Sequence, residues 1–266
     1  MRPRVRVPVP APNKDDLTVQ VFLFAMLRAV IKHAKKLLAK RGIKVLLIII
    51  GAAVLFEVIA LIWLATSVNR YHDFWEAKAN ESGEITYLAL GDSAAQGIGA
   101  TNPMKGYVGL IAQDIEAKSG KSVRIVNISK TGAKFDDYLK EQAPLVKTMK
   151  PDVITIQIGA NDIKGFNAEQ YRAKFKKVLA TLPDGTFVSN MPLFNSRPGS
   201  TASGKQGSSI IQEELRNYPN LVFVDLQSET TRHQSIFGFA PDLFHPNNIS
   251  YKNWANAFLD QIRMLY

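Results

Sequence analysis

From Ile85 to Ser93 the chain reads ITYLALGDS, an apolar run that ends in a Gly-Asp-Ser tripeptide. A short run of β-branched, aromatic and aliphatic residues closed by turn-forming residues predicts a buried strand. Four later runs have the same character, and stretches with helical periodicity separate them. The strand candidates are 85–90, 122–128, 152–158, 186–191 and 221–225, and the helical patterns lie near 106–119, 134–149, 167–182, 207–217 and 249–265. This alternation predicts parallel βαβ units and therefore an α/β domain with a doubly wound, parallel five-stranded sheet over residues 85–266.

Polar clusters follow the first three predicted strands. In order along the chain they are Gly91-Asp92-Ser93, Thr131-Gly132 and Gly159-Ala160-Asn161-Asp162. In open α/β sheets, ligands bind beyond the carboxyl ends of the strands, so these clusters are expected to share one edge. The segment 241–246 (PDLFHP) precedes the last helical pattern and supplies a fourth polar group.

The residue types in these clusters suit nucleophilic catalysis by a serine. A serine hydroxyl attacks an acyl carbonyl only if a base takes its proton, a third group orients the base and donors meet the developing oxyanion. Ser93 is the candidate nucleophile, His245 the candidate base and Asp242 its orienting partner. The candidate oxyanion donors are the backbone N–H groups of Ser93 and Gly132 and the side-chain amide of Asn161. The other histidines, His33, His72 and His233, are weaker candidates for the base because they adjoin the apolar segment or lie in a polar stretch.

Each of these residues also has a purely structural interpretation. Gly-Asp-Ser is a common turn, Gly132 suits a turn that needs positive φ, and Asn161 can cap a helix. His245 can pack in its loop while Asp242 caps the local turn. Their placement together at one sheet edge favours the catalytic interpretation.

The sequence resembles the SGNH or GDSL hydrolases. The residues that carry the resemblance are Gly91-Asp92-Ser93, the NISKTG segment 127–132, Gly159-Ala160-Asn161-Asp162 and Asp242-Leu243-Phe244-His245, which match the four sequence blocks of that family in order. The resemblance covers about residues 85–266 and assigns to Ser93, His245, Asp242, Gly132 and Asn161 the roles given above. It implies a flavodoxin-like three-layer fold and metal-free, cofactor-free hydrolysis of esters or thioesters of lipids, acylated sugars and small acyl compounds. Two positions depart from the pattern: Ala94 replaces the Leu of the family name, and Leu243 stands where a Gly is usual.

Other kinds of site lack their motifs. An α/β-hydrolase needs G-x-S-x-G, but the chain reads Gly91-Asp92-Ser93-Ala94-Ala95. H-E-x-x-H and G-x-G-x-x-G are absent, which disfavours a zinc hydrolase and a dinucleotide site. The chain has no cysteine, so thiol catalysis, disulfides and cysteine metal ligands are excluded.

Residues 45–68 (VLLIIIGAAVLFEVIALIWLATSV) form an apolar stretch with one ionisable residue, Glu57. As a helix of about 36 Å it can span a hydrocarbon layer of about 30 Å. A cleaved signal peptide is the alternative, although its apolar core is usually shorter and nearer the N-terminus. Glu57 lies near the expected bilayer centre, where it is either neutral or paired across a helix dimer. We therefore predict a single transmembrane helix.

Charge around this stretch predicts its orientation. Residues 1–44 hold eleven Lys/Arg and two Asp, whereas residues 69–266 hold 22 basic and 20 acidic residues. The positive-inside rule places residues 1–44 in the cytoplasm and the catalytic domain outside the cytoplasmic membrane. Trp63, Tyr71, Phe74 and Trp75 fit an aromatic belt at the outer interface. A nucleic-acid partner is not expected, because the folded body is nearly neutral.

The segments around the two main elements are predicted from composition. Residues 1–14 suit a disordered tail, and 17–31 suit an amphipathic helix on the inner leaflet or against a partner. Residues 69–84 are predicted as a polar linker. The small-residue-rich loop 193–209 is either a mobile rim over the acyl pocket or a disordered surface loop.

The leading functional hypothesis is a membrane-anchored serine esterase that acts outside the cytoplasmic membrane. The expected partners are the membrane and an acylated small molecule, glycan or lipid of the cell envelope. An acyltransferase with the same residues, which passes the acyl group to envelope polysaccharide, is the nearest alternative. An inactive surface-binding module is the alternative from another class.

Overall fold

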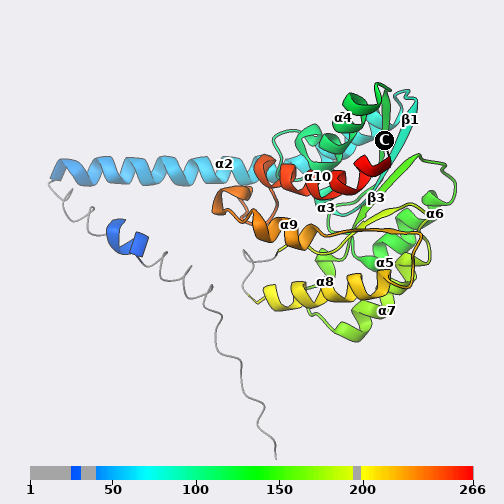
Figure 1. Ribbon diagram of the computed structural model, residues 1–266. Helices are drawn as coiled ribbons and strands as arrows, with labels where there is room; N and C mark the ends of the chain where they lie inside the picture. The colour runs from blue at the N-terminus through cyan, green and yellow to red at the C-terminus, as the bar shows by residue number, and fades with distance from the viewer. Residues whose placement is uncertain (1–24, 31–39, 194–198, 266) are drawn as a thin grey trace, which may run out of the picture. The chain divides into compact units, whose positions relative to one another are not determined.

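The computed structural model describes residues 25–30, 40–193 and 199–265 of the 266-residue chain (Figure 1). The predicted tail 1–14 and most of the segment 17–31 lie outside the described residues.

The chain divides into two compact units, residues 1–59 and 60–266. In the first unit, residues 25–30 are helical and exposed, and the long helix α2 (Lys40–Ala79) begins. Within the described residues, α2 is the one helix whose length and composition allow it to cross a membrane, and its most apolar part is unburied. A long apolar helix therefore precedes the α/β domain, as the sequence predicts.

The second unit is built on the predicted five-stranded parallel sheet. Its order is β2-β1-β3-β4-β5, and every neighbouring pair is parallel. The strands are β1 (Ile85–Gly91), β2 (Val123–Asn127), β3 (Val153–Gln157), β4 (Phe187–Ser189) and β5 (Val222–Val224). The chain winds from β1 to one side for β2 and to the other side for β3, β4 and β5. This flavodoxin-like order has its switch point between β1 and β3, where ligands bind in such sheets.

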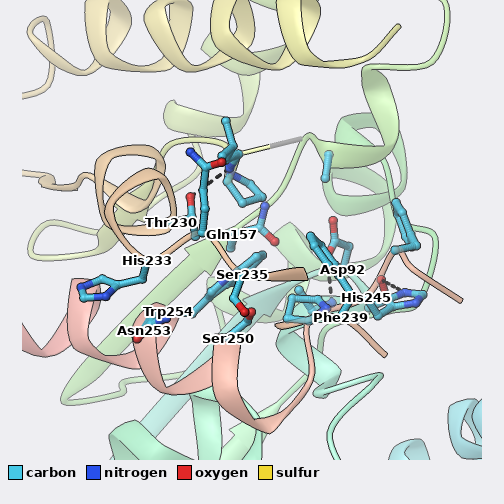
Figure 2. A pocket seen from close by; sticks show the side chains of 18 of the residues that line it. Asp92, Gln157, Thr230, His233, Ser235, Phe239, His245, Ser250, Asn253 and Trp254 are labelled. Carbon is cyan, nitrogen blue, oxygen red and sulfur yellow. Dashed lines mark hydrogen bonds between the residues drawn. The ribbon is translucent and has the colours of Figure 1, made fainter. Parts of the chain in front are cut away.

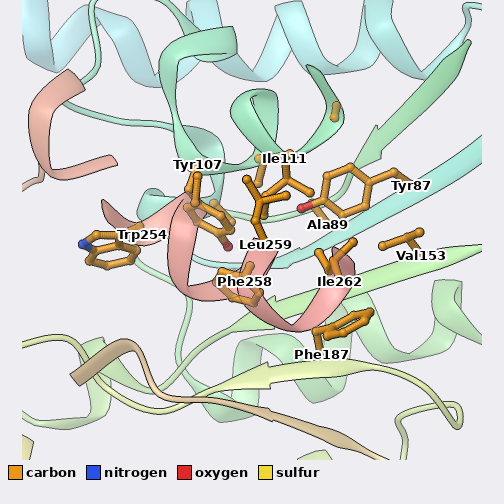
Figure 3. Packing of buried hydrophobic residues seen from close by; sticks show 14 of the residues in the cluster. Tyr87, Ala89, Tyr107, Ile111, Val153, Phe187, Trp254, Phe258, Leu259 and Ile262 are labelled. Carbon is orange, nitrogen blue, oxygen red and sulfur yellow. The ribbon is translucent and has the colours of Figure 1, made fainter. Parts of the chain in front are cut away.

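Two hydrophobic clusters cover the two faces of the sheet. Alternate residues of β1 separate between them: Tyr87 and Ala89 belong to one, Leu88 and Leu90 to the other. The first includes α4 and α10, where the rings of Tyr107 and Phe258 stack 5.2 Å apart (Figure 3). The second is formed mainly by α7, α8 and the segment after β2. The result is the expected three-layer α/β/α arrangement, because the period of two along a strand sends apolar side chains to both faces.

The helical elements after α2 lie between the strands in the chain or follow the last strand. They are α3 (Ser93–Gln96), η1 (Pro103–Lys105), α4 (Tyr107–Ser119), α5 (Phe135–Asp137), η2 (Tyr138–Gln142), α6 (Ala143–Val146), η3 (Ala160–Asp162), α7 (Ala168–Leu179), α8 (Thr201–Leu215), α9 (Leu226–Arg232), η4 (Ile236–Gly238), α10 (Asn248–Ile262) and η5 (Arg263–Leu265). The helix predicted at 134–149 is interrupted by η2, a π-helical turn.

The predicted polar linker 69–84 is wrong over most of its length, because α2 continues to Ala79. Its last turns belong to the folded domain. Tyr71 and Trp75 are buried, with 4% and 2% of their surface exposed, and they do not form an aromatic belt. The Tyr71 hydroxyl donates to the carbonyl of Ala100 (2.5 Å), and Trp75 Nε1 donates to the carbonyl of Gln96 (3.0 Å). Core packing therefore extends the helix beyond the apolar stretch.

Asp162 ties the loop after β3 to the start of α5. Its Oδ2 accepts a hydrogen bond from the backbone N–H of Phe135 (3.1 Å). Burial raises the pKa of this carboxyl to about 6, against the lowering effects of that hydrogen bond and of Lys174 and Lys134. The folded protein thus holds the Asp162 proton more tightly than the unfolded chain does.

This difference predicts a pH dependence of stability. An unfolded aspartate titrates near ~3.9, so between about pH 4 and pH 6 the unfolded chain is already ionised at Asp162 while the folded protein keeps the proton. The Asp162 contribution to the free energy of unfolding is fully present below this range and is lost as the pH rises through it. Asp162→Asn stays neutral and should remove this loss.

Denaturant unfolding from pH 4 to pH 7 measures the effect. The stability of Asp162→Asn relative to wild type should increase across this range. Asp184→Asn, an exposed control, should follow wild type. If Asp162→Asn follows wild type as well, Asp162 does not carry this proton.

Candidate active site

Ser93 begins α3, and only Asp92 separates it from the end of β1. Asp92 caps this short helix, with its Oδ1 accepting from the backbone N–H of Ala94 (3.0 Å). Gly91 has φ 139°, and a Cβ at this position would collide with the backbone carbonyl oxygen of Gln157 in β3. The Gln142 side chain fixes the same glycine from the π-helical turn, accepting from its N–H (2.9 Å) and donating to its carbonyl (2.8 Å). The strand-to-helix turn therefore holds Ser93 at the sheet edge.

The structure brings three of the predicted site residues into one chain of hydrogen bonds. His245 Nε2 lies 3.0 Å from Ser93 Oγ, and His245 Nδ1 lies 2.6 Å from Asp242 Oδ2 (Figure 2 labels His245). Ser93 and His245 are separated by 152 positions in the sequence. Such an arrangement can move a proton from the hydroxyl to the imidazole while the carboxylate balances the charge that forms.

A tight turn orients Asp242 toward His245. Its Oδ1 accepts from the backbone N–H groups of Phe244 and His245, both at 3.0 Å. Burial disfavours the charge on Asp242, but the hydrogen bonds from the His245 ring and from these amides outweigh it and lower the pKa of the carboxyl. Leu243, inside the turn, has φ 52°, in the left-handed region that favours glycine. Asp242 is therefore an ionised partner for the imidazole.

The predicted oxyanion donors differ in how the structure places them. Asn161, in η3, lines the cavity beside Ser93. Its Nδ2 donates to the carbonyl of Ala133 (3.0 Å) and lies 3.4 Å from Asp92 Oδ2. Gly132 forms an exposed turn with φ 80° next to Ala133 and is not among the residues that line the cavity. Asn161 thus connects the Gly132 turn to the residue before Ser93.

A cavity opens beside Ser93 and His245, with walls from several segments (Figure 2). Gln157, at the end of β3, lines it and is fully buried, yet neither its Nε2 nor its Oε1 has a hydrogen-bond partner among the described residues. Buried amides are nearly always paired, so this one has capacity for a ligand. Further lining residues are Ala160, Leu193, Thr230, His233, Gln234, Ser235, Phe239, Phe244, Ser250, Asn253 and Trp254.

Several residues contribute to this cavity without a clear signal in the sequence. Gln157 lies inside a predicted strand. A polar residue near the carboxyl end of a buried strand was the signal that could have indicated a site residue. α9 was not predicted, and it brings Thr230 to the wall, with His233 just after its end. His233 Nε2 lies 3.4 Å from Glu229 Oε1. Gly99 has φ 97°, and a Cβ there would collide with the carbonyl of Pro246, so this glycine lets the His245 loop approach α3.

The predicted loop 193–209 is wrong over its second half. Residues from Thr201 onward form the start of α8, and residues 194–198 lie outside the described residues. Gly204 and Gly207 are buried in this helix, and a Cβ at Gly207 would lie 3.2 Å from Ile163 Cδ1. The small residues, whose composition predicts a loop, instead permit close packing within a helix. Leu193 still reaches the cavity wall.

A multidomain esterase from Ruminococcus flavefaciens is 22% identical to this chain over 227 residues. The alignment covers 69% of this chain and 29% of the relative, so the chain spans less than a third of the length of that protein.

Solved structures share the fold. An alpha/beta hydrolase enzyme from the metagenome of Lake Arreo, Spain, matches with a TM-score of 0.57 and 22% identity, over 70% of this chain and 98% of that one. An acetylxylan esterase from Geobacillus stearothermophilus matches with a TM-score of 0.53 and 20% identity, over 68% of this chain and 95% of that one.

A family match covers the segments of the candidate site. The model of the GDSL-like Lipase/Acylhydrolase family matches residues 89–252, more than half of the chain. This range contains Ser93, Asn161, Asp242 and His245. The chain belongs to the GDSL-like lipase/acylhydrolase family.

Proposed function

We propose that this protein is a serine esterase that hydrolyses acyl esters through Ser93, His245 and Asp242. The observation that carries the proposal is the continuous chain of hydrogen bonds from the Ser93 hydroxyl through His245 to Asp242. Membership in the GDSL-like lipase/acylhydrolase family supports the same chemistry.

In the proposed acylation step, Ser93 Oγ attacks the ester carbonyl carbon while His245 Nε2 takes the hydroxyl proton. The carbonyl oxygen becomes an oxyanion, for which the backbone N–H groups of Ser93 and Gly132 and the Asn161 amide are the proposed donors. The carbon–oxygen bond to the leaving alcohol then breaks, and His245 returns its proton to that alcohol. Water repeats the sequence on the Ser93 ester and releases the free acid.

The cavity supports an acylated glycan as the substrate class. It combines an aromatic side chain, Trp254, with the unpaired amide of Gln157 and with polar groups such as Asn253 and Ser250. This mixture suits a sugar, which presents apolar ring faces and hydroxyl groups together. The acetylxylan esterase that shares the fold acts on such a molecule, which supports the same class here.

α2 is proposed to anchor the enzyme in the membrane, with residues 1–44 in the cytoplasm and the catalytic domain outside it. The length, apolar composition and exposure of this helix support the anchor. The excess of Lys and Arg in residues 1–44 supports the orientation. Acyl groups on cell-envelope glycans would then be within reach of the site.

The first prediction from this proposal concerns the proposed catalytic residues. Ser93→Ala should lower kcat for p-nitrophenyl acetate by about 10⁶-fold, because no nucleophile remains, and Asp242→Asn by about 10⁴-fold. Ser93→Ala should also abolish labelling by a fluorophosphonate probe, whereas Ser209→Ala, at an exposed serine, should leave rate and labelling unchanged. Thermal unfolding checks that each variant is folded. A folded Ser93→Ala protein with wild-type activity would refute the mechanism.

The second prediction concerns Gln157. Gln157→Met keeps the side-chain volume but removes the hydrogen-bonding groups, so kcat/KM for an acetylated xylo-oligosaccharide should fall by roughly 10- to 100-fold. Thermal stability should hold or rise, because no unpaired amide stays buried in the ligand-free protein. Gln227→Met, another glutamine with an unpaired buried amide nitrogen but outside the cavity lining, is the matched control. Equal losses in both variants would remove Gln157 from substrate binding.

The third prediction concerns the orientation. The chain has no cysteine, so Lys118→Cys on the exposed face of α4 and Lys14→Cys in the N-terminal segment each introduce one thiol. A membrane-impermeant maleimide added to intact cells should label Lys118→Cys and should label Lys14→Cys only after lysis. The opposite pattern would reverse the orientation.

A further inference from the structure

We propose that an apolar tip of the catalytic domain, formed by Ile236, Phe237 and Leu243, inserts into the lipid surface beside α2. The entrance to the active-site cavity then opens at the lipid–water interface. This inference rests on the proposed membrane anchor, and its partner is the outer lipid surface of the membrane that α2 spans.

The apolar tip is exposed to an unusual degree for large hydrophobic side chains. Ile236 is 69% exposed, Phe237 73% and Leu243 65%. Among the described residues after α2, six large hydrophobic side chains are exposed, and four of them lie within residues 236–249. Several exposed apolar side chains within one short segment are typical of a surface that contacts a partner or a membrane, whereas single exposed apolar residues are ordinary.

Leu243 carries a second cost besides its exposure. Its φ of 52° lies in the left-handed region, which is unfavourable for a residue with a Cβ. Glycine would adopt the same turn without strain and without an exposed side chain. A leucine in this strained turn therefore leaves most of its side chain without contacts inside the described domain. Insertion of its side chain into lipid supplies the missing stabilisation.

Contacts within residues 60–266 fix the level of the apolar tip along α2. Ala240, between Phe237 and Leu243 in the sequence, is buried in a cluster with Leu64 and Tyr71. Leu64 belongs to the apolar stretch predicted to span the membrane, four residues before its end. Figure 1 shows the segment that carries η4 next to this part of α2. The tip is thus attached where the proposed span leaves the bilayer.

The side chains of α2 near Leu64 are of the types that are common at a membrane interface. Trp63 packs against the same cluster, and the Arg70 guanidinium lies 5.2 Å from the centre of its ring. Arg70 also donates to the carbonyl of Trp63 (3.0 Å). Tryptophan and arginine are typical of the headgroup region, where an amphipathic ring and a cation are both stable. A loop attached here would place exposed apolar side chains among lipids.

The same loop forms part of the active site. Phe239 and Phe244 line the cavity, and Leu243 lies between Asp242 and Phe244. Lipid contact at the apolar tip would therefore hold the cavity entrance against the membrane surface. The substrates that gain from this arrangement are acyl esters carried by membrane-embedded molecules, such as lipid-linked saccharides or lipids themselves.

Single-cysteine variants of the full-length protein test the depth of the apolar tip. Phe237→Cys and Leu243→Cys are labelled with an environment-sensitive fluorophore and reconstituted in phosphatidylcholine–phosphatidylglycerol vesicles. Lys118→Cys, on an exposed face of α4, is the control. Doxyl-labelled lipid should reduce emission about two-fold or more at positions 237 and 243, because a lipid-inserted dye contacts the quencher. Emission at position 118 should not change.

The other outcomes contradict the inference in distinguishable ways. If alkaline carbonate extracts the protein from the vesicles, the membrane anchor itself is wrong. If the protein is retained but the labels at 237 and 243 are not quenched, the anchor stands and the lipid contact is refuted. A third outcome is that the labels show an apolar environment that becomes stronger with the number of protein molecules per vesicle and is not quenched by the doxyl lipid. In that case a second copy of the protein covers the tip, and the inference is also refuted.

Activity provides an independent measurement. Phe237→Asp should reduce hydrolysis of a vesicle-embedded fluorogenic acyl ester about 10-fold while leaving hydrolysis of soluble p-nitrophenyl acetate unchanged, because a charge resists insertion. Met264→Asp, at a residue that is 72% exposed in η5, should affect neither substrate. Equal rates for wild type and Phe237→Asp on the embedded ester would overturn the inference. If the wild-type protein hydrolyses neither substrate, the proposed esterase function itself is refuted.

Discussion

Close backbone packing at the carboxyl edge of the sheet is the constraint on which the site depends. At Gly91 the end of β1 approaches the carbonyl of Gln157 so closely that any Cβ would collide with it. At Gly99 the segment after α3 approaches the carbonyl of Pro246 in the same way. The first contact aims Ser93 out of the sheet edge, and the second lets His245 come within 3.0 Å of Ser93 Oγ. A side chain at either glycine would separate elements that the site needs together.

The sequence predicted the features that depend on local pattern. The five strands were found because a buried parallel strand is a short apolar run whatever its neighbours are. Ser93, Asp242 and His245 could be proposed as site residues because Ser93 follows a strand end and the other two occupy one short turn. The extension of α2 and the start of α8 could not be found in this way. Trp75 donates to the carbonyl of Gln96 in α3, and a Cβ at Gly207 would lie 3.3 Å from Tyr171 Cζ in α7, so tertiary contacts contribute to both elements.

Gln157 shows a different limit of the sequence. Its position in a predicted buried strand was correct, but a buried glutamine is ordinarily paired with a neighbour. Only the structure shows that the amide lacks a partner among the described residues and faces the cavity. Similarly, the positive φ of Leu243 follows from the turn that directs Asp242 to His245. In both cases the local cost becomes evident only when the residue is seen beside the site.

The end of α2 shows where the catalytic domain begins. Trp75 donates to the carbonyl of Gln96 at the end of α3, and Tyr71 donates to the carbonyl of Ala100. A domain that began at Ile85 would leave both carbonyls without these donors and would open the core where the Trp75 side chain packs. Because α3 also carries Ser93, the loss would fall on the element that presents the proposed nucleophile. The residues after the apolar stretch are therefore part of the catalytic fold, and the helix that is proposed to anchor the enzyme also supports its active site.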